Sequence, residues 1–298
     1  MSCPRRIDLH MHTAVSDGTD APEEILARVK AAGIELFSVT DHDAIKGCEI
    51  VRAHWRAGDP QFLTGVEFSC RDEEGRYHIL GYRYDPAAPS IRDVVAEGHA
   101  LRMNKLKQRL SFLKEAYGFV FSDEDTAALF ALDNPGKPHI GNLMVRYGYA
   151  PTRDAAIRDY LNKLGSGKAY VRPEAAIRAI LGAGGIPVLA HPSYGRGDET
   201  VVGAAMDARL RRLIGFGLQG VEAFYSGFSP KLQAEMLAFA ERYALYVTAG
   251  SDYHGDNKLV RLGDTNLPET GDYPVGLYRF LDAVAASGAQ TARSCKTP

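Results

Sequence analysis

Short apolar runs alternate with segments of helical periodicity over most of the chain. The apolar runs have the length of buried strands, and they lie at 34–39, 62–66, 186–190, 220–224 and 245–249. Segments with amphipathic helical spacing separate them, at 22–33, 173–181, 204–214 and 230–242. This alternation is typical of a parallel sheet covered by helices, because parallel strands need a long crossover connection. The pattern therefore predicts an α/β fold with a closed sheet.

Residues 98–170 break this alternation. Leu101, Leu106, Leu110 and Leu113 form an apolar stripe at helical spacing. Further helical patterns follow, separated by Gly, Pro and Asn, near 123–131, 139–147 and 152–163. The sequence thus predicts an all-helical insertion at 98–170 within an α/β domain formed by residues 1–97 and 171–298.

The charge distribution changes this picture of the insertion. The whole chain has a net charge of −2, but residues 98–172 hold 12 Lys and Arg against 7 Asp and Glu. A basic block beside an acidic body suits an anionic substrate. A solvated helical surface that happens to be basic explains the same charge, and charge alone does not separate these two interpretations.

The chain lacks features of a membrane protein. No apolar run approaches the roughly 20 residues needed to span a bilayer, and the N-terminal residues lack the apolar segment of a signal peptide. We expect a cytoplasmic protein that has no membrane partner and no obligate protein partner.

Residues of the type that bind metals lie at or just after the predicted strands and in Asp- and His-rich turns. His10 and His12 follow the first short strand, Glu67 follows 62–66 and His191 follows 186–190. Six of the nine histidines share this placement. The candidate metal ligands are His10, His12, Asp17, His42, Glu67, His78, His191, Asp252 and His254. Imidazoles and carboxylates that recur at strand ends are how a parallel α/β barrel builds a multi-metal site.

These motifs resemble those of the PHP (polymerase and histidinol phosphatase) family, in family order. They are His10-x-His12, Thr40-Asp41-His42-Asp43, Gly65-Val66-Glu67, His78, His191-Pro192 and Asp252-x-His254. The chain looks most like the small stand-alone phosphoesterases of this family that act on nucleotides. The resemblance implies a distorted (β/α)7 TIM-like barrel with up to three divalent metals.

The resemblance also implies a division of the ligands. His10, His12, Glu67 and Asp252 would hold one metal, Glu67, His78 and His191 a second, and Asp17, His42 and His254 a third. Asp8, Asp41 and Asp43 would orient the histidine rings through their N–H groups. Nitrogen and oxygen ligands without a thiolate suit Mn²⁺, Zn²⁺ or Fe²⁺. We expect two or three Mn²⁺ ions per chain.

The expected reaction is hydrolysis of a phosphoric monoester. We expect removal of the 3′-phosphate from a nucleoside 3′,5′-bisphosphate, such as adenosine 3′,5′-bisphosphate, by attack of a metal-bridging hydroxide. Glu67 would bridge the metals, and His191, His254 or the third metal would supply the proton or cation that the leaving oxygen needs.

Other reactions and roles stay open. Two use the same site, namely a 5′-to-3′ exoribonuclease acting on short RNA and a histidinol-phosphate phosphatase, and Asp17 disfavours the second because related histidinol phosphatases often carry histidine there. An amidohydrolase or a non-catalytic metal-stabilised module are further alternatives.

Substrate recognition is expected from the insertion. Arg102, Lys105 and Arg109 recur at i, i+3 and i+7, so that one helical face carries three cations. Asn104 and Asn134 are candidates for contacts with a base or ribose, and Lys137, His139 and Lys168 for contacts with phosphate. Tyr194 and Arg196 are expected near the same opening, with the tyrosine ring stacking on a base. Simple solvent exposure is the alternative for each of these residues.

Overall fold

The computed structural model describes residues 3–165, 170–194 and 200–285. Its strands form two sheets. The first contains three parallel strands in the order β1 (Ile7–Asp8), β2 (Leu36–Phe37) and β3 (Gln61–Phe62). The second contains five strands in chain order, β4 (Gly65–Arg71), β5 (Arg76–Tyr82), β6 (Ile186–Leu189), β7 (Gly220–Tyr225) and β8 (Tyr246–Gly250). The mixed α/β class is as predicted.

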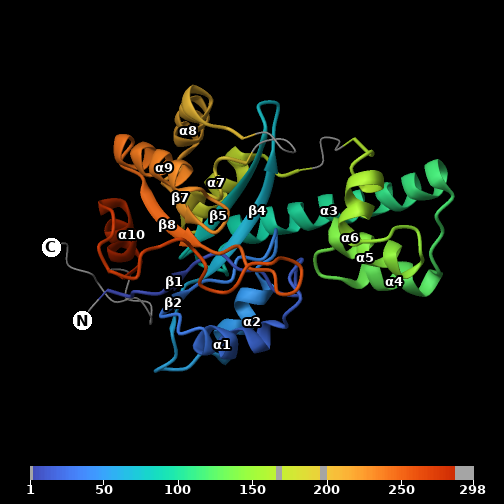
Figure 1. Cartoon of the computed structure of the whole chain (residues 1–298), viewed down its shortest axis with the longest axis horizontal. Helices are drawn as coiled ribbons and strands as arrows, with labels where there is room; N and C mark the ends of the chain where they lie inside the picture. The colour runs from blue at the N-terminus through green and yellow to red at the C-terminus, as the bar shows by residue number, and fades with distance from the viewer. Residues whose placement is uncertain (1–2, 166–169, 195–199, 286–298) are drawn as a thin grey trace.

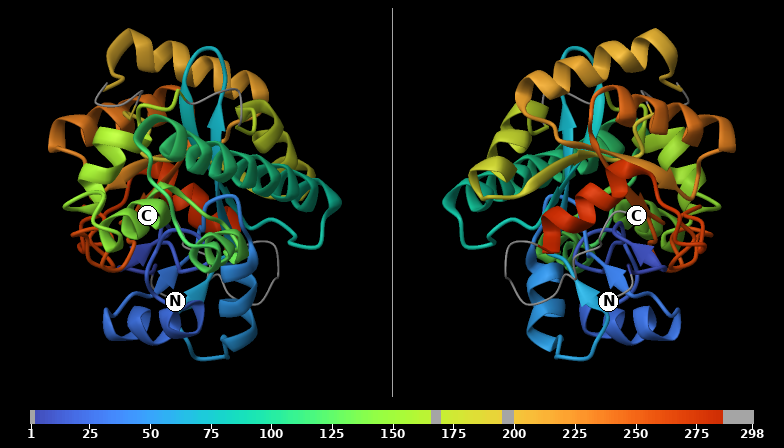
Figure 2. Two further views of the ribbon diagram at one scale, coloured as in Figure 1. Left: turned by 90° about the vertical axis from the view of Figure 1, so that its right-hand side faces the viewer. Right: turned by 90° about the vertical axis from the view of Figure 1, so that its left-hand side faces the viewer.

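Helices cover these sheets. In the first sheet α1 (Pro22–Ala31) and α2 (Lys46–His54) connect the strands. In the second sheet α8 (Gly203–Phe216) joins β6 to β7 and α9 (Pro230–Arg242) joins β7 to β8, so these strands run parallel. The remaining covering helices are α7 (Pro173–Gly182) and α10 (Val275–Ala285). Figure 2 shows α8 at one outer edge of the molecule and α1 and α2 at the opposite edge.

The second sheet is not wholly parallel, which corrects the predicted parallel arrangement. β5 runs antiparallel to both β4 and β6. Only residues 72–75 separate β4 from β5, and a connection this short forms a hairpin, because a parallel crossover needs a dozen or more residues.

The predicted closed barrel is also not found among the described strands, which pair into two open sheets. The sheets meet through isolated contacts: the Leu9 amide donates to the Ala249 carbonyl at 2.9 Å, and His42 forms a bridge with Glu67. Each strand of the first sheet is only two residues long. Beyond these residues the chain forms no further regular strand pairs within this sheet. The hydrogen bonds between strands therefore do not close into a barrel.

One long helix connects the α/β body to the predicted insertion. α3 (Pro89–Tyr117) begins with its buried Ile91 and Val94 in the main apolar core and continues outward. Its later Leu106 and Leu113 belong to a second apolar core. Gly118, at a φ of 71°, ends the helix in a left-handed conformation that favours glycine.

The second core packs α3 against the helices that follow it, α4 (Asp123–Ala131), α5 (Lys137–Arg146), α6 (Arg153–Ala156) and a π-helical turn (Ile157–Leu161). We call these elements, together with the outer half of α3, the helical insertion. Figure 1 shows that it projects to one side of the sheets. Of the described helices, none combines the length and the apolar composition that crossing a bilayer requires.

Candidate metal centre

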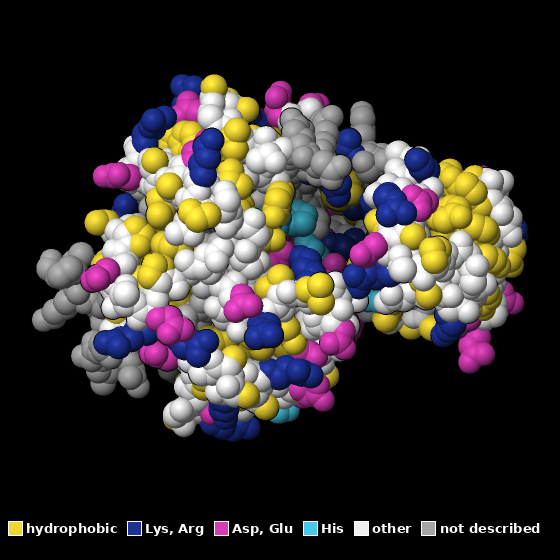
Figure 3. Space-filling model, in the orientation of Figure 1, with side chains coloured by type: hydrophobic (Ala, Val, Ile, Leu, Met, Phe, Trp, Pro, Cys, Tyr) yellow, Lys and Arg dark blue, Asp and Glu magenta, His cyan; other side chains and the backbone are white. Residues whose placement is uncertain are grey.

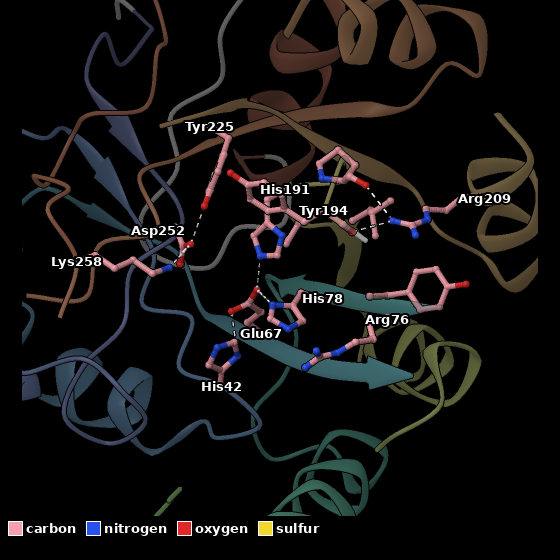
Figure 4. A pocket seen from close by; sticks show the side chains of 14 residues that line it. His42, Glu67, Arg76, His78, His191, Tyr194, Arg209, Tyr225, Asp252 and Lys258 are labelled. Carbon is pink, nitrogen blue, oxygen red and sulfur yellow. Dashed lines mark hydrogen bonds and ion pairs between the residues drawn. The ribbon is translucent and has the colours of Figure 1, made fainter. Parts of the chain in front are cut away.

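The nine predicted ligands converge on one place in the structure, although they come from elements spread over the whole chain. His10 and His12 follow β1 and are fully buried. Glu67 lies within β4, and His78 lies on the neighbouring β5. The other ligands lie in the segments that follow strands or in the Asp17 turn. Figure 4 shows His42, His78 and His191 directed towards Glu67.

Glu67 is the centre of this arrangement, because both of its oxygens face imidazole nitrogens. Its Oε2 atom lies 3.3 Å from His10 Nε2, 3.2 Å from His12 Nε2 and 3.0 Å from His42 Nδ1. Its Oε1 atom lies 2.8 Å from His78 Nδ1 and 3.2 Å from His191 Nε2. This geometry is compatible with the bridging role that the sequence suggested for Glu67.

Two aspartates complete the cluster on either side. Asp252 Oδ1 lies 3.5 Å from His10 Nε2 and 3.4 Å from His12 Nε2. Asp17 Oδ1 lies 3.3 Å from His254 Nε2. Three ligand groups have their donor atoms close together: His10, His12 and Glu67; His42, Glu67 and His78; and His12, Asp17, His42 and His254. These groups overlap at Glu67, His12 and His42, and the sequence-based division assigned His12 and His42 to a single metal each.

The donor atoms fit a bound cation. His10 Nε2, His12 Nε2, Asp17 Oδ1 and Glu67 Oε2 are buried and have no hydrogen-bond partner among the described residues. Leaving such an atom without a partner costs about 1–3 kcal/mol, and four of them in one cluster require a common explanation. A divalent metal supplies it, because imidazole nitrogen and carboxylate oxygen are ordinary ligands of Zn²⁺, Mn²⁺ and Fe²⁺.

The carboxylates of the cluster are ionised. Burial would raise the pKa of Glu67, but the facing His42 and His78 rings outweigh it and hold the pKa well below its ordinary range. Burial likewise opposes ionisation of Asp252, and Lys258 and His10 lower the pKa of its carboxyl well below the ordinary value. Both groups are therefore negatively charged and able to bind a cation at neutral pH.

The aspartates that were expected to orient histidine rings have other partners. Asp8 accepts hydrogen bonds from the backbone and hydroxyl of Ser251 at 2.9 and 2.6 Å. Asp41 accepts from the backbone and hydroxyl of Thr13 at 2.8 and 2.7 Å. These carboxylates brace the ligand-bearing loops, so the predicted ring contacts of Asp8 and Asp41 are wrong.

Asp43 also braces the site through groups other than rings. It accepts from the backbone of Ser69 at 2.9 Å and from Arg102 Nε at 2.7 Å. Its expected contact with a histidine ring is therefore wrong as well. The contact with Arg102 ties the middle of α3 to the metal centre.

Sequence reasoning missed three residues of the site. Glu222 on β7 lies 2.9 Å from His10 Nδ1, and Lys258 Nζ lies 2.5 Å from Asp252 Oδ2. Arg76, the first residue of β5, lines the cavities beside the cluster. A charged residue inside the apolar run 220–224 was a detectable signal for Glu222. Lys258 and Arg76 carry no comparable signal, because isolated basic residues near turns are common.

Two cavities open beside the cluster. The larger one, of about 320 Å³, is lined by His42, Glu67, His78, His191, Tyr194, Tyr225, Asp252 and Lys258, among others. The smaller one, of about 170 Å³, shares His42, Arg76 and His78 with it and extends towards the insertion. Figure 3 shows histidine and basic side chains in the hollow between the α/β body and the helical insertion.

The smaller cavity is strongly cationic. Its described lining includes Arg76, Arg102, Lys105, Arg109 and Lys137, with Asp17 as its one described carboxylate. We call these five side chains the cationic cluster. Three of them are the predicted helical face of α3, and Lys137 is the first residue of α5.

Lys105 is held in an unusual environment within this cluster. Its Nζ atom lies 3.2 Å from the centre of the Tyr170 ring. Burial, followed by repulsion from Arg102, lowers the pKa of Lys105 to about 6. Burial also lowers the pKa of Lys137 to about 8. An anion in this cavity would favour the charged forms of both.

The other predicted substrate contacts are less uniform. Tyr194 is 45% exposed at the edge of the larger cavity, while the Nδ1 atom of His139 accepts a hydrogen bond from the Gly136 amide at 3.0 Å. Asn104 is exposed and lies outside both cavity linings. Asn134 is buried, and its amide atoms have no hydrogen-bond partner among the described residues. Lys168 and Arg196 lie outside the described residues.

This mixed α/β fold with a histidine- and carboxylate-rich centre is that of a metal-dependent phosphoesterase, a hydrolase. The chain belongs to the PHP domain family, whose sequence model matches residues 8–171.

Relatives with different activities resemble the chain over most of its length. It is 32% identical to a 3′,5′-nucleoside bisphosphate phosphatase of Chromobacterium violaceum, covering 90% of this chain and 92% of that protein. It is 29% identical to a 5′-3′ exoribonuclease of Haemophilus influenzae, covering 87% and 93%. The solved structure of a metal-dependent phosphoesterase from Bifidobacterium adolescentis superposes with a TM-score of 0.75 at 29% identity, covering 89% and 93%. The family is thus shown, and the substrate within it is left open.

Proposed function

We propose that this phosphoesterase removes the 3′-phosphate from nucleoside 3′,5′-bisphosphates, such as adenosine 3′,5′-bisphosphate, and releases the 5′-monophosphate. The observation that carries this proposal is the cationic cluster beside the metal centre. The two cavities share His42, Arg76 and His78, so a molecule in one lies next to the other. A substrate with two phosphates can place one at the metal centre and the second among the cations.

The same observation argues against histidinol phosphate. That molecule carries one phosphate and an ammonium group, and the ammonium would face the basic side chains of the cationic cluster. Like charges brought together without intervening water repel each other strongly. A nucleoside bisphosphate places a second phosphate beside these basic side chains, so it is attracted where the ammonium group would be repelled.

The residues have separate roles in the proposed reaction. His10, His12, Asp17, His42, Glu67, His78, His191, Asp252 and His254 would hold two or three divalent ions, for which we propose Mn²⁺. Bound metal supplies charge neutralisation and a water of lowered pKa. His191 is our candidate for the group that serves the leaving oxygen, because it lines the larger cavity whereas His254 is not part of that lining.

The remaining contacts that we propose are with the base and the second phosphate of the substrate. Tyr194 lies at the edge of the larger cavity with its ring 5.5 Å from the His191 ring. We propose that it stacks on the base, since every base offers an aromatic face. Arg102, Lys105, Arg109 and Lys137 would contact the second phosphate, as charge-assisted hydrogen bonds to phosphate are strong.

A 5′-to-3′ exoribonuclease is the second candidate, and the similarity to the Haemophilus influenzae enzyme favours it. The cationic cluster would then hold the 5′-phosphate of an RNA chain while the first diester lies at the metal centre. The chemistry of the site is the same, so the length of the preferred substrate separates the two.

A panel of substrates tests the proposal. Phosphate release would be measured with Mn²⁺ on adenosine 3′,5′-bisphosphate, adenosine 3′-monophosphate, histidinol phosphate and 5′-phosphorylated oligoribonucleotides. We expect the bisphosphate to be preferred and its product to be the 5′-monophosphate. Shortening of the oligonucleotides at a higher kcat/KM would favour the exoribonuclease, and preferred turnover of histidinol phosphate would contradict both.

The Glu67→Gln variant tests the site on the same panel. We expect loss of activity by at least a hundredfold with a retained fold, because the amide can no longer offer two anionic oxygens to cations. Glu23→Gln, on the exposed side of α1, is the matched control. Unchanged turnover in Glu67→Gln would contradict the proposed metal centre.

A further inference from the structure

Glu222 is a fully buried carboxylate that none of the predicted roles uses. It lies in β7, a strand whose six residues are all buried, and its side chain is 0% exposed. Among the described residues no lysine or arginine forms an ion pair with it; its recorded ion-pair partner is the His10 ring. A buried carboxylate is costly unless each oxygen is hydrogen-bonded or paired. Both oxygens of Glu222 are therefore expected to have partners.

One oxygen fixes the orientation of His10. Glu222 Oε1 lies 2.9 Å from His10 Nδ1, and a carboxylate oxygen accepts hydrogen bonds. The contact assigns Nδ1 as the nitrogen that donates to Glu222 and leaves Nε2 as the ring nitrogen that a metal can bind. That Nε2 atom has no hydrogen-bond partner among the described residues and faces Glu67 Oε2 at 3.3 Å and Asp252 Oδ1 at 3.5 Å.

The other oxygen holds the backbone of His191. Glu222 Oε2 accepts a hydrogen bond from the His191 amide at 2.8 Å. His191 has a φ of 26°, a value that residues with a side chain rarely adopt and that the surroundings must stabilise. Glu222 therefore supports the turn from which the His191 ring reaches Glu67.

The neighbouring strand leaves space for this arrangement. Gly250 on β8 pairs with the end of β7, and a Cβ atom there would lie 2.3 Å from the His10 Cβ and 2.4 Å from Glu222 Oε1. Any larger residue at 250 would displace the contact between Glu222 and His10. The glycine is thus part of the same arrangement.

We propose that Glu222 is a positioning residue that sets the metal-binding tautomer of His10 and the backbone of His191 together. The inference rests on the proposed metal centre, since it assigns His10 Nε2 and the His191 ring to metal. Carboxylates that accept from the far nitrogen of a metal-binding histidine fix its tautomer, and their loss typically weakens metal binding by about 10–100-fold.

Glu222→Gln is the informative variant, because it keeps the shape of the side chain. Its amide oxygen can still accept from the His191 amide, which leaves its NH₂ group against His10 Nδ1. His10 must then accept at Nδ1 and carry its proton on Nε2, directed at Glu67 and Asp252. Thr248→Val is the matched control: Thr248 is buried and pairs with Glu222 in the adjacent strand, outside the ligand set.

Two measurements test the inference on the full-length chain. Mn²⁺ titration by calorimetry, with metal content by mass spectrometry, should show one weakened site in Glu222→Gln, by about 10–100-fold, and none in Thr248→Val. Nitrogen-15 NMR of the protein loaded with diamagnetic Zn²⁺ should show His10 protonated on Nδ1 in the wild type, and this signal should be lost in Glu222→Gln. The second measurement does not depend on activity.

The results that would overturn the role of Glu222 differ from those that would overturn the proposed substrate. A wild-type His10 protonated on Nε2 would overturn the inference even if the variant did not fold. Metal binding and tautomer that are both unchanged in a folded Glu222→Gln would also overturn it. A wild type that binds Mn²⁺ with the expected tautomer but hydrolyses no nucleotide would leave Glu222 in its role and contradict the substrate proposal alone.

Discussion

Individual residues of the site are ionisable groups whose surroundings suit a bound ligand. Glu67 is a buried carboxylate that faces five imidazole rings, and the rings hold its pKa well below the ordinary range. Lys105 is a partly buried amine beside Tyr170, and burial lowers its pKa to about 6. A cation would satisfy the oxygens of Glu67 and a phosphate would favour the charged form of Lys105, so both ligands should stabilise the folded protein.

The pKa of Lys105 leads to a prediction on stability. Its pKa falls from 10.5 to about 6 on folding, so between these pH values the unfolded chain binds a proton that the folded chain does not. The free energy of unfolding therefore decreases as pH falls from about 10 to 6, because protonation of Lys105 favours the unfolded chain. We expect Lys105→Met to raise the midpoint of thermal unfolding by a few degrees at pH 7, with a smaller gain at pH 10.

Thermal unfolding at both pH values, without substrate, checks this prediction. Lys107→Met, on the exposed side of the same helix, is the control and should leave the midpoint unchanged. A lower midpoint for Lys105→Met at pH 7 would show that Lys105 stabilises the fold. The variant should also raise KM for the bisphosphate, because a phosphate in the cavity favours the charged lysine.

Secondary-structure elements show which parts of the site can be predicted from sequence. His10 and His191 were identified because each follows an apolar strand and carries metal-ligand chemistry. The partners of Glu222 were not identified, because Glu222 and His10 are in contact although 212 positions separate them in the sequence. Which side chains face each other at that distance depends on the pairing of strands, which local patterns do not determine.

The closed barrel failed as a prediction for a related reason. Apolar runs indicated where strands lie, but not how far their hydrogen-bonded ladders continue. In β1, β2 and β3 pairing covers two residues each, since loops bearing ligands or turns begin at once. The four residues 72–75 between β4 and β5 are too few for a parallel crossover, a signal for the hairpin that the prediction of a parallel sheet did not use.

The helical insertion has its own apolar core, which leads to a prediction at this scale. Leu113 is fully buried in the second core, between the outer half of α3 and the helices that follow. Leu113→Ala should lower the free energy of unfolding by about 2–5 kcal/mol. Because the cationic cluster depends on α3 and α5, KM for the bisphosphate should rise while Mn²⁺ affinity stays unchanged.

Chemical denaturation, Mn²⁺ calorimetry and steady-state kinetics on this variant provide the check. A loss of Mn²⁺ binding that parallels the loss of stability would contradict the independence of the two cores. Leu110→Ala, only partly buried on the same helix, should give the same pattern with a smaller effect.

The whole molecule brings two surfaces of different origin together. The α/β body supplies the histidine and carboxylate cluster, and the helical insertion supplies most of the cations facing it. The hollow between them is therefore suited to a small molecule with two anionic groups (Figure 3). In the proposed function the metal centre hydrolyses the phosphate ester, and the insertion determines which ester is bound.

The most direct test of this division is the preference for a second phosphate. The ratio of kcat/KM for adenosine 3′,5′-bisphosphate to that for adenosine 3′-monophosphate would be measured in the wild type, Arg109→Met and Lys107→Met. Arg109 lines the cationic cavity, and Lys107 is exposed on the same helix. We expect Arg109→Met to lower the ratio by about tenfold or more, since a hydrogen bond to a charged group contributes about 1.5–3 kcal/mol, and Lys107→Met to leave it unchanged. An equal loss on both substrates in Arg109→Met would contradict a phosphate-binding role for the insertion.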